Sequence, residues 1–187
     1  MLRGRPKERL REFLAKRAER KGILLRRLRE LLTSTEVLDA QEFITKLRRD
    51  IAEAREYVLV ISPFLRKDPV DLFLSYKEVS EQKDKIRIVV ITKPVEDAFV
   101  RNKKEHKECI ETLRKNGISV FERERLHFKA VIVDNEILYI GSINPLSLRV
   151  VEYLPEDYML RFVSEALTTE IIDRTIGWSD FETYITG

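Results

Sequence analysis

The chain has 187 residues, enough for one ordinary α/β domain and a short extension, and 43% of the residues are apolar. It contains a single cysteine, Cys109, so no disulfide can form within the chain and a reducing, cytoplasmic location is expected. No apolar run approaches the roughly 18–20 residues of a membrane span, so no membrane partner is expected. These features argue against a disulfide-stapled secreted domain and against a membrane protein.

Charge is distributed unevenly along the chain, although the formal net charge is only +3. Residues 1–33 hold 12 Lys and Arg against 4 Glu, a net charge of +8, and the rest of the chain carries −5. Leucines recur near one stripe of this segment, which predicts a basic N-terminal helical extension over 1–33 before a domain over 34–187. Nucleic acid would suit this segment as a partner, and a plain solvated face is an equally open interpretation.

Hydrophobic periodicity predicts the elements of the domain. Helices are expected over 37–56, 69–82, 97–116 and 164–176, and strands over 57–61, 86–91, 118–121, 127–133, 136–141 and 157–163. Thr33, Ser34 and Thr35 offer caps for the first of these helices. Strands and helices alternate up to residue 121, which predicts parallel strands with right-handed crossovers. Asp134-Asn135 then predicts a tight hairpin. The expected fold class is α/β, with a mixed β-sheet flanked by helices on both faces.

The strand predicted over 127–133 carries polar side chains at one end. Both of its faces are apolar towards the hairpin, so it should be central and covered on both sides. Lys129 is costly on such a strand unless something negative or polar meets it. This end of the strand is therefore expected to open into a site.

The predicted hairpin would bring four polar side chains together. With a two-residue loop, Lys129 lies opposite Ile140. Two residues further along, His127 lies opposite Ser142, and cross-strand partners share a face of the sheet. Asn144 has the same parity as Ser142, so all four polar side chains should converge.

These residue types fit one kind of chemistry. The imidazole of His127 can attack phosphorus or transfer a proton near neutral pH. Lys129 and Asn144 can hold non-bridging phosphate oxygens. Ser142 adds a donor, and the missing side chain of Gly141 leaves room for a ligand. No Cys/His cluster or dense group of carboxylates accompanies them, so neither a metal nor another cofactor is expected. The alternative is a purely structural set.

The same residues form a motif with fixed spacing. It reads His-x-Lys-x4-Asp-x6-Gly-Ser-x-Asn and runs from His127 through Lys129, Asp134, Gly141 and Ser142 to Asn144. Six fixed positions make a chance match on the order of one in 100,000 for a chain of this length. The motif resembles the signature of the phospholipase D superfamily, and the resemblance extends loosely from Tyr57 to Val163. It implies a phospholipase D-like α-β-α sandwich.

This resemblance also implies an activity. Family members use two such motifs around a pseudo-two-fold axis, and single-motif members of about this size, chiefly nucleases, dimerise to join them. The only other histidine here is His106, and no motif surrounds it. The implied protein is a homodimer in which His127 of one subunit forms a phosphohistidine and His127 of the other protonates the leaving oxygen. Lys129 and Asn144 would grip the phosphate, with Ser142 in support.

Family patterns further imply an acidic residue behind the histidine and after the motif. Glu152, Glu156 and Asp157 are the candidates. Asp157 is favoured because residues 157–161 read as a returning strand. Asp134 is expected to be a turn residue, a role compatible with orienting its neighbours.

Two other groups have ordinary interpretations. His106 and Cys109 are expected at the core edge or the surface of a helix. Trp178, Phe181 and Tyr184 have the aromatic rings needed to stack on bases, but packing of the C-terminus against the body or a partner subunit is favoured.

Three hypotheses about function follow. The leading one is a metal-independent, nuclease-like phosphodiesterase that acts on DNA or RNA as a homodimer. The stretch 141–147 supports it, because it resembles phospholipase D-like modules associated with helicases. The second is a lipid phosphodiesterase of the phospholipase D type. The third is a non-catalytic nucleic-acid-binding or dimerisation module whose N-terminal helices dock onto a helicase or nuclease partner.

Overall fold

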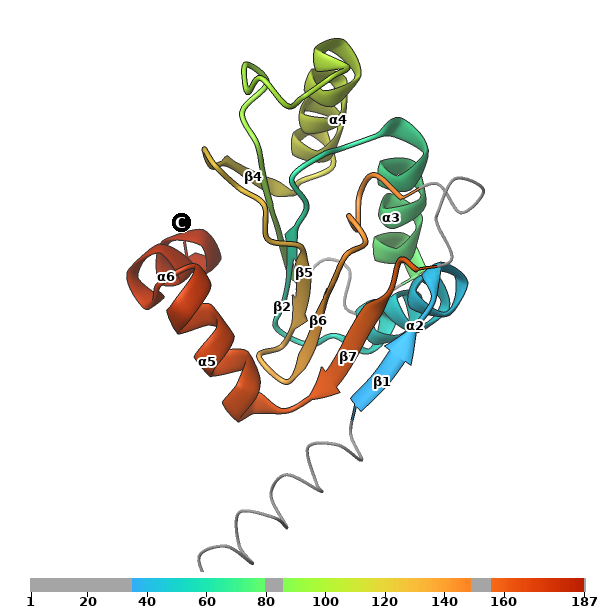
Figure 1. Cartoon of the computed structure of the whole chain (residues 1–187), viewed down its shortest axis with the longest axis vertical. Coiled ribbons are helices and arrows are strands. Elements are labelled where there is room, and N and C mark those ends of the chain that lie inside the picture. Colours follow the sequence, from blue (N-terminus) through green and yellow to red (C-terminus); the bar gives the residue numbers. More distant parts are fainter. Residues whose placement is uncertain (1–34, 80–85, 149–155, 187) are drawn as a thin grey trace, which may run out of the picture. The chain divides into compact units, whose positions relative to one another are not determined.

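The computed structural model describes residues 35–79, 86–148 and 156–186, so the extension expected over 1–33 lies outside the described residues. The helices are α2 (Ala40–Glu53), α3 (Lys67–Val79), α4 (Lys103–Lys115), α5 (Glu165–Thr175) and α6 (Trp178–Thr186). The strands are β1 (Thr35–Leu38), β2 (Tyr57–Ile61), β3 (Arg87–Thr92), β4 (Ser119–Glu122), β5 (Ala130–Val133), β6 (Ile137–Gly141) and β7 (Met159–Val163) (Figure 1).

The strands form one seven-stranded sheet in the order β1-β7-β6-β5-β2-β3-β4. β2, β3 and β4 run parallel, as the alternation of strands and helices predicts. β5 is antiparallel to β2 and to β6, and β6 is antiparallel to β7. The predicted mixed sheet is therefore confirmed, and β5 lies in its middle with all of its residues buried.

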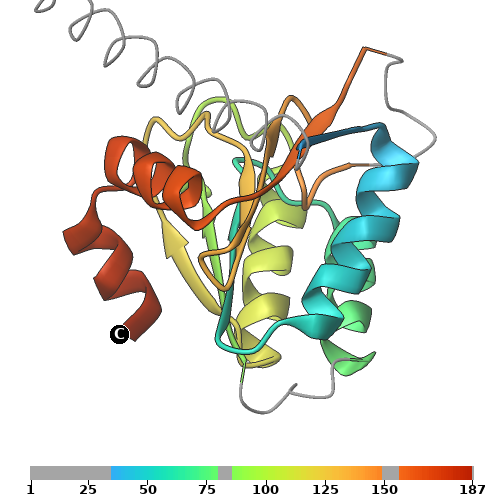
Figure 2. The same ribbon diagram turned by 90° about the horizontal axis from the view of Figure 1, so that it is seen from below.

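Helices cover both faces of this sheet, as predicted (Figure 2). The helices α2, α3 and α4 pack over the face that presents Val58 and Val131. The helices α5 and α6 pack over the opposite face, which presents Leu59 and Ile132. Neighbouring residues of one strand thus enter separate cores, and burying each such side chain contributes roughly 1.5–3 kcal/mol.

The segment before α2 differs from the helix predicted over 37–56. Residues 35–38 form β1 at the edge of the sheet, beside β7. The helix begins only after Asp39, whose carboxylate accepts from the amide of Glu42 at 2.8 Å. The carboxylate of Glu42 accepts in turn from the amide of Asp39 at 3.0 Å, which completes a capping box. The cap is therefore Asp39, not residues 33–35.

The C-terminal aromatic residues pack against the domain, the interpretation favoured from the sequence. Gly177 ends α5 with a positive φ of 84°, and α6, which the periodicity does not predict, follows it. Phe181 packs edge-to-face on Tyr57, with ring centroids 5.7 Å apart. Tyr184 packs on Phe121 with centroids 4.7 Å apart. These contacts hold α6 on the sheet.

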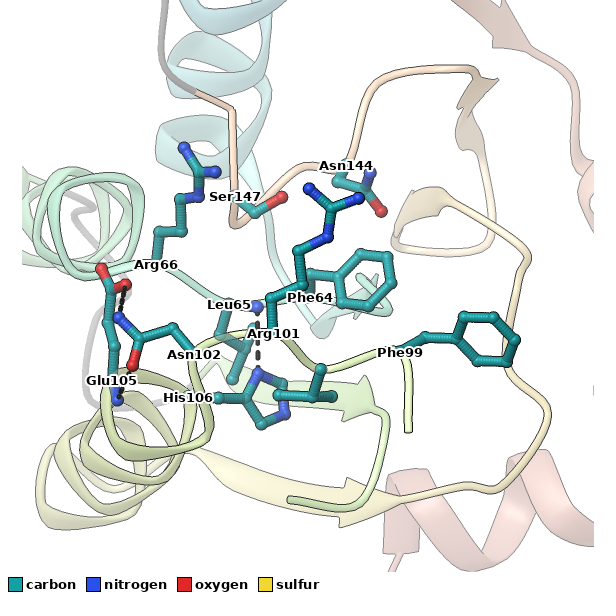
Figure 3. Close-up of a pocket in the computed structure, with 11 residues that line it drawn as sticks. Phe64, Leu65, Arg66, Phe99, Arg101, Asn102, Glu105, His106, Asn144 and Ser147 are labelled. Atoms are coloured by element: carbon teal, nitrogen blue, oxygen red, sulfur yellow. Dashed lines mark hydrogen bonds between the residues drawn. The ribbon is translucent and has the colours of Figure 1, made fainter. Parts of the chain in front are cut away.

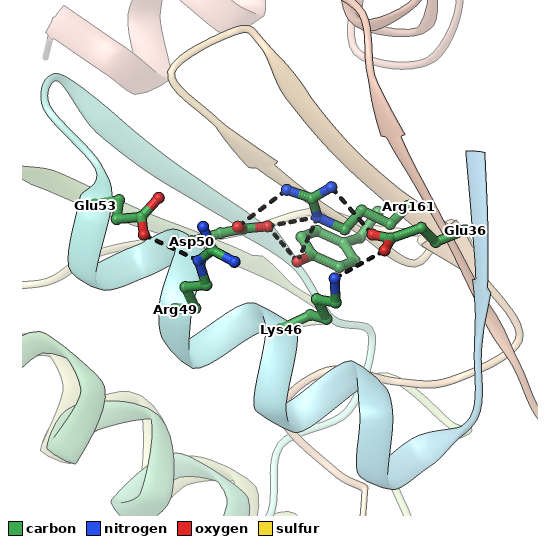
Figure 4. A network of polar contacts seen from close by, with 7 residues as sticks. Glu36, Lys46, Arg49, Asp50, Glu53 and Arg161 are labelled. Carbon is green, nitrogen blue, oxygen red and sulfur yellow. Dashed lines mark hydrogen bonds and ion pairs between the residues drawn. The ribbon is translucent and has the colours of Figure 1, made fainter. Parts of the chain in front are cut away.

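A buried ion-pair network ties α2 to the neighbouring strands (Figure 4). Arg161 of β7 donates twice to Asp50 of α2, at 2.7 and 3.0 Å, and once to Glu36 of β1, at 3.1 Å. Tyr139 of β6 donates its hydroxyl hydrogen to the same Asp50 carboxylate. Lys46 pairs with Glu36 at 2.8 Å. Asp50 is only 4% exposed, so its charge depends on these partners.

The turn between β5 and β6 contains three residues, one more than predicted. Its first two residues have positive φ angles of 51° and 56°, and the amide of Glu136 donates to the carbonyl of Val133 at 3.0 Å. A tight turn is therefore confirmed. The carbonyl of Glu136, however, accepts from the amide of Ser164 at 2.8 Å. Val133 pairs with Ile137, and the register is shifted by one residue from the prediction.

Candidate active site

His127 and Lys129 lie in the irregular segment that leads into β5. His127 is exposed and borders a hollow together with Arg123 and Leu126. Lys129 is partly buried, and its ammonium donates to the backbone carbonyl of His127 at 2.8 Å. Burial lowers the pKa of Lys129, and the positive charge of Lys93 lowers it further. A bound anion would relieve both effects, so this ammonium is well placed to hold one.

Strand pairing does not place the four predicted residues on one face of the sheet. Ala130, the first residue of β5, pairs with Ile140. The predicted partner of Ile140 was Lys129, so that pairing is wrong, and the same shift removes the predicted pairing of His127 with Ser142. Regular pairing stops after β6, and the chain bends there. In the described residues, no hydrogen bond joins the imidazole of His127 to the other three side chains.

Ser142 fastens β6 to the segment before β7. Its hydroxyl donates to the carboxylate of Asp157 at 2.9 Å and accepts from the amide of Tyr158 at 3.1 Å. Its own amide donates to the carbonyl of Tyr158 at 3.0 Å. The single hydroxyl hydrogen is therefore engaged, which differs from the free donor expected at Ser142. Asp157, favoured as the acid behind His127, is the acceptor of this bond.

Asn144 faces a hollow with a volume of about 590 Å³ at the ends of β2 and β3 (Figure 3). The side chains that surround it include Phe64, Arg66, Phe99, Arg101 and Ser147. The Oδ1 atom of Asn144 is buried and accepts no hydrogen bond within the described part of the chain. Buried polar atoms are nearly always paired, so this amide is a candidate for ligand contact.

Hydrogen bonds tie the segment that carries Asn144 to the loop after β2. The hydroxyl of Ser62, which is fully buried, accepts from the amide of Leu146 at 3.1 Å and donates to the carbonyl of Phe64 at 2.9 Å. The amide of Arg66 donates to the carbonyl of Leu146 at 2.9 Å. The position of Asn144 relative to β2 is thereby fixed.

Gly141 makes room for a neighbouring strand, not for a ligand as expected. It pairs with Met159 of β7. A Cβ added here would lie 2.2 Å from the carbonyl oxygen of Tyr158 and 2.9 Å from the sulfur of Met159. The closer atom belongs to the backbone, so no side-chain rotation can relieve the clash. The missing side chain is required for packing β6 against β7.

Asp134 lies in the turn at the opposite end of β5 from His127 and Lys129. Its carboxylate accepts three backbone hydrogen bonds from the amides of residues 55–57, at 2.7, 2.8 and 3.0 Å. Those residues lead into β2. The predicted turn role is confirmed, and Asp134 anchors the hairpin to β2 instead of joining His127.

The loop after β3 contributes a buried cation. The ammonium of Lys93 pairs with the carboxylate of Asp97 at 3.0 and 3.1 Å. It also lies 4.7 Å from the ring centroid of Phe99 and 5.6 Å from that of Phe64. The hydrogen bond from the Phe99 amide, together with Lys93, holds the pKa of Asp97 below its ordinary value. The charge of Lys93, although paired with Asp97, also lowers the pKa of Lys129.

His106 organises the same end of the sheet from α4. Its Nδ1 accepts from the amide of Leu65 at 3.2 Å, and its Nε2 lies 2.9 Å from the carbonyl oxygen of Lys93. A ring that accepts at Nδ1 carries its proton on Nε2, so this imidazole is neutral. His106 and Cys109 are both buried, which selects the core over the surface for these two residues.

The sequence motif does not indicate Lys93, Phe99 or Arg101. These residues follow β3, whose carboxyl end lies beside that of β2 because the two strands are parallel. Ligands of open α/β sheets bind beyond the carboxyl ends of the strands. The position of Lys93, Phe99 and Arg101 after the strand predicted over 86–91 is the sequence signal that points to them.

A family model described as "Cardiolipin synthase, PLD-like domain" matches residues 47–171, about two thirds of the chain. The chain belongs to the phospholipase D-like family. The matched range includes the whole motif from His127 to Asn144 and runs from α2 into α5. No curated protein matches the sequence significantly.

Solved structures share the fold of this phospholipase D-like domain. Nuc from Salmonella typhimurium, a phospholipase D family member, aligns with a TM-score of 0.58 at 14% identity, over 81% of this chain and 95% of its own. NucT from Helicobacter pylori aligns with a TM-score of 0.56 at 15% identity, over 81% and 97%. The phosphatidylserine synthase of Haemophilus influenzae Rd KW20 aligns with a TM-score of 0.60 at 16% identity, over 83% of this chain and 37% of its own.

Family membership supports phosphodiesterase chemistry in general. Lys93 and Lys129 both lie at the end of the sheet that carries the motif, and the charge of Lys93 lowers the pKa of Lys129. In the described ranges, no helix is long and apolar enough to cross a membrane. The same ranges contain no group of three or more His, Cys, Asp or Glu side chains arranged to hold a metal ion.

Proposed function

We propose that this phospholipase D-like domain is a metal-independent phosphodiesterase of nucleic acid, with an active site completed by a second copy of the chain. His127 is the nucleophile, and Lys129 and Asn144 hold the phosphate. The bond between Ser142 and Asp157 positions the segment that carries Asn144. The charge of the transition state is met by side-chain cations, Lys129 foremost among them.

The accessibility of a single histidine is the observation that carries this proposal. The reaction needs one neutral and one protonated imidazole in a single pocket. His127 is exposed, whereas both ring nitrogens of His106, the only other histidine of the chain, take part in buried hydrogen bonds. The second imidazole is therefore His127 of another copy.

The reaction proceeds in two balanced steps. In the first, a ring nitrogen of His127 forms a bond to phosphorus while the bond from phosphorus to the leaving oxygen breaks. The leaving oxygen takes a proton from the imidazolium of the second His127. In the second step, water attacks phosphorus and gives its proton to that same imidazole, and the bond between phosphorus and nitrogen breaks. The product is a phosphomonoester, and both histidines return to their starting states.

Charge favours nucleic acid over a lipid substrate. Arg66 and Arg101 line the hollow beside Asn144, and residues 1–33 carry a net charge of +8, so both suit a polyanion. A lipid substrate would require a continuous apolar surface beside the site. The large exposed apolar side chains of the described residues come instead from separate elements, and they are Val37, Leu72, Phe99, Tyr158, Val163 and Trp178.

Cleavage of labelled single-stranded DNA and RNA in excess EDTA tests the chemistry. We expect wild-type cleavage to be unaffected by EDTA, and His127→Ala to lose at least about a thousandfold in rate, as nucleophile variants do. Denaturation shortly after mixing should leave label on the wild-type protein and none on the variant. Lys107→Ala, an exposed change on α4, serves as the control. Cleavage that stops on adding EDTA, or that survives in His127→Ala, contradicts the proposal.

Mixing active and inactive copies tests the shared site. If each site uses His127 from two copies, activity falls with the square of the wild-type fraction when His127→Ala protein is exchanged into the dimer. A linear fall, or full activity from a species that light scattering shows to be a monomer, would contradict the two-copy site.

A lipid phosphodiesterase is the second candidate, because the matching family model is described as cardiolipin synthase and one structural neighbour is a phosphatidylserine synthase. It predicts release of headgroup from phosphatidylglycerol or cardiolipin vesicles by the wild type but not by His127→Ala. Faster turnover of these vesicles than of oligonucleotides would favour it.

A further inference from the structure

The hollow beside Asn144 contains more than the motif requires. It is bordered by the loops after β2 and β3 and by the start of α4, and Figure 3 shows the side chains of Arg101, Arg66 and Ser147 gathered on the side of Asn144. None of these residues except Asn144 belongs to the motif. The hollow therefore adds cationic and polar side chains beside Asn144.

Phe99 is the most exposed large apolar side chain of the described residues, at 73%. One face of its ring is covered by the ammonium of Lys93, 4.7 Å from the centroid. Lys93 is itself buried and held by Asp97, so the cation restrains one face of the ring while the rest of the ring lies in solvent. An aromatic ring that is held by a cation on one side and is open on the other is a platform for a flat ligand such as a base.

Arg101 supplies an uncommitted positive charge beside this platform. It is exposed and has no hydrogen bond or ion pair in the described part of the chain. The one carboxylate that lines the hollow, Glu105, is already engaged by the amide of Lys67 at 3.0 Å and by the side-chain amide of Asn102 at 3.0 Å. The lining of the hollow holds two arginines, Arg66 and Arg101, against this single carboxylate, so its net charge is positive.

Asn144 links this hollow to the motif, because it belongs to both. We propose that the hollow binds the nucleotide next to the scissile phosphate, with its base stacked on Phe99 and its phosphate held by Arg101. The inference rests on the proposed function, since it assumes a nucleic-acid substrate. Stacking on Phe99 requires an unpaired base, so the substrate class is single-stranded nucleic acid.

Binding to the inactive full-length protein tests this site without any need for turnover. In a His127→Ala background, fluorescence anisotropy measures the Kd of a labelled oligothymidylate and of an abasic oligomer with the same phosphates. Phe99→Ala should weaken binding of the oligothymidylate about tenfold, the effect expected for one lost base stack, and leave the abasic oligomer unchanged. Arg101→Ala should weaken both and lower the slope of log Kd against log salt by about 0.7, the value for one phosphate contact on a single strand.

Matched variants control for general effects. Leu72→Ala removes an exposed apolar side chain from α3, and Lys107→Ala removes an exposed positive charge from α4, both outside the hollow. Neither should reproduce the selective effects. The inference is overturned if Phe99→Ala binds both ligands as the parent does or weakens both equally. It is also overturned if a duplex binds as tightly as the single strand, or if vesicles of phosphatidylglycerol displace the oligonucleotide at matched phosphate concentration.

The two proposals fail in different ways. Cleavage of the abasic oligomer by protein that retains His127 reports the motif without a base stack, and we expect the wild type and the Lys107→Ala control to cleave it. Absence of hydrolysis by every form of the protein, with the base-selective effect of Phe99→Ala intact, would sink the proposed activity and leave the binding site standing. Normal hydrolysis with no base-selective effect would leave the proposed activity standing and overturn the binding site.

Discussion

The backbone amide of Leu65 donates to Nδ1 of His106 across 3.2 Å, and this bond joins the loop after β2 to α4. Because the other ring nitrogen faces the carbonyl of Lys93, one neutral imidazole links the two loops that border the candidate site. Protonation at Nδ1 would abolish its ability to accept. The geometry of both loops is thus coupled to the ionisation of a residue that takes no part in the chemistry.

We expect stability to fall as the solution is acidified below about pH 6.5, the ordinary pKa of histidine. Burial lowers the pKa of His106 in the folded protein, although the bond to the Lys93 carbonyl and the charges of Glu122 and Asp97 oppose the shift. Unfolded chains then bind a proton that folded ones do not. The stabilisation from neutral His106 is complete above the pKa of this histidine in the unfolded chain. It is lost as pH falls through the lower pKa of the folded protein, and the free energy of unfolding then falls by up to about 1.4 kcal/mol per pH unit.

Urea denaturation between pH 7.5 and 5.5 measures this slope. His106→Gln should be less stable at neutral pH and should lack most of the pH dependence in that window. A variant whose stability falls with acid as steeply as that of the wild type would show that other groups are responsible.

Gly141→Ala should destabilise the domain by about 1–3 kcal/mol or more, as overpacking does. The new methyl group would meet the carbonyl oxygen of Tyr158 at 2.2 Å and push β7 away from β6. Gly177→Ala is the comparison, because a Cβ there meets nothing within 4 Å and only its φ of 84° is unfavourable, which costs roughly 1–2 kcal/mol. We expect thermal melting to show the larger loss for Gly141→Ala, and hydrolysis by folded protein to decline in that variant alone.

Asp134→Ala should cost on the order of 3 kcal/mol, because three backbone amides lose a charged acceptor. Asp173→Ala, which removes an exposed carboxylate from α5, should change the free energy of unfolding by no more than about 0.5 kcal/mol. The rate constant of folded Asp134→Ala should remain near that of the wild type. A large loss of rate in fully folded Asp134→Ala protein would mean that Asp134 acts on the chemistry and not only on the fold.

Asp50→Ala should destabilise by about 3–5 kcal/mol, because it leaves the guanidinium of Arg161 buried without its main partner. The matched change on the same helix is Glu53→Ala, which breaks an exposed pair with Arg49 and should cost less than about 1 kcal/mol. Replacing both Asp50 and Arg161 by Leu should recover much of the loss. An equal loss of unfolding free energy in Asp50→Ala and Glu53→Ala would show that water reaches the network around Asp50.

Much of the fold follows from local patterns. The strand expected over 57–61 coincides with β2, because a short β-branched run between turn-forming residues leaves little ambiguity. The central position of β5 follows from its two apolar faces. β1 could not be predicted in the same way, because its four residues pair with β7, more than a hundred residues away in the chain. The apolar pattern predicts a helix from residue 37, and only the cap at Asp39 excludes residues 37 and 38 from it.

The candidate site was predictable in composition but not in arrangement. The spacing of the motif identifies His127 and Lys129, yet the predicted register failed because the amide of Ser164, from a distant segment, engages the carbonyl of Glu136. Nothing near Gly141 in the sequence distinguishes room for a ligand from room for a strand. Contacts with sequence-distant partners decided each of these points, and no local pattern records them.

The third residue of the hairpin turn has an influence that reaches the other end of the sheet. Side chains alternate between two cores along β6. If Glu136 paired with Val133, as a two-residue turn would require, the pairing would shift by one position and exchange the surroundings of Leu138 and Tyr139. The hydroxyl of Tyr139 would leave Asp50, and the chain beyond β6 would enter its bends from the opposite side. The number of residues in a surface turn that carries no chemistry therefore decides which core each side chain of β6 enters.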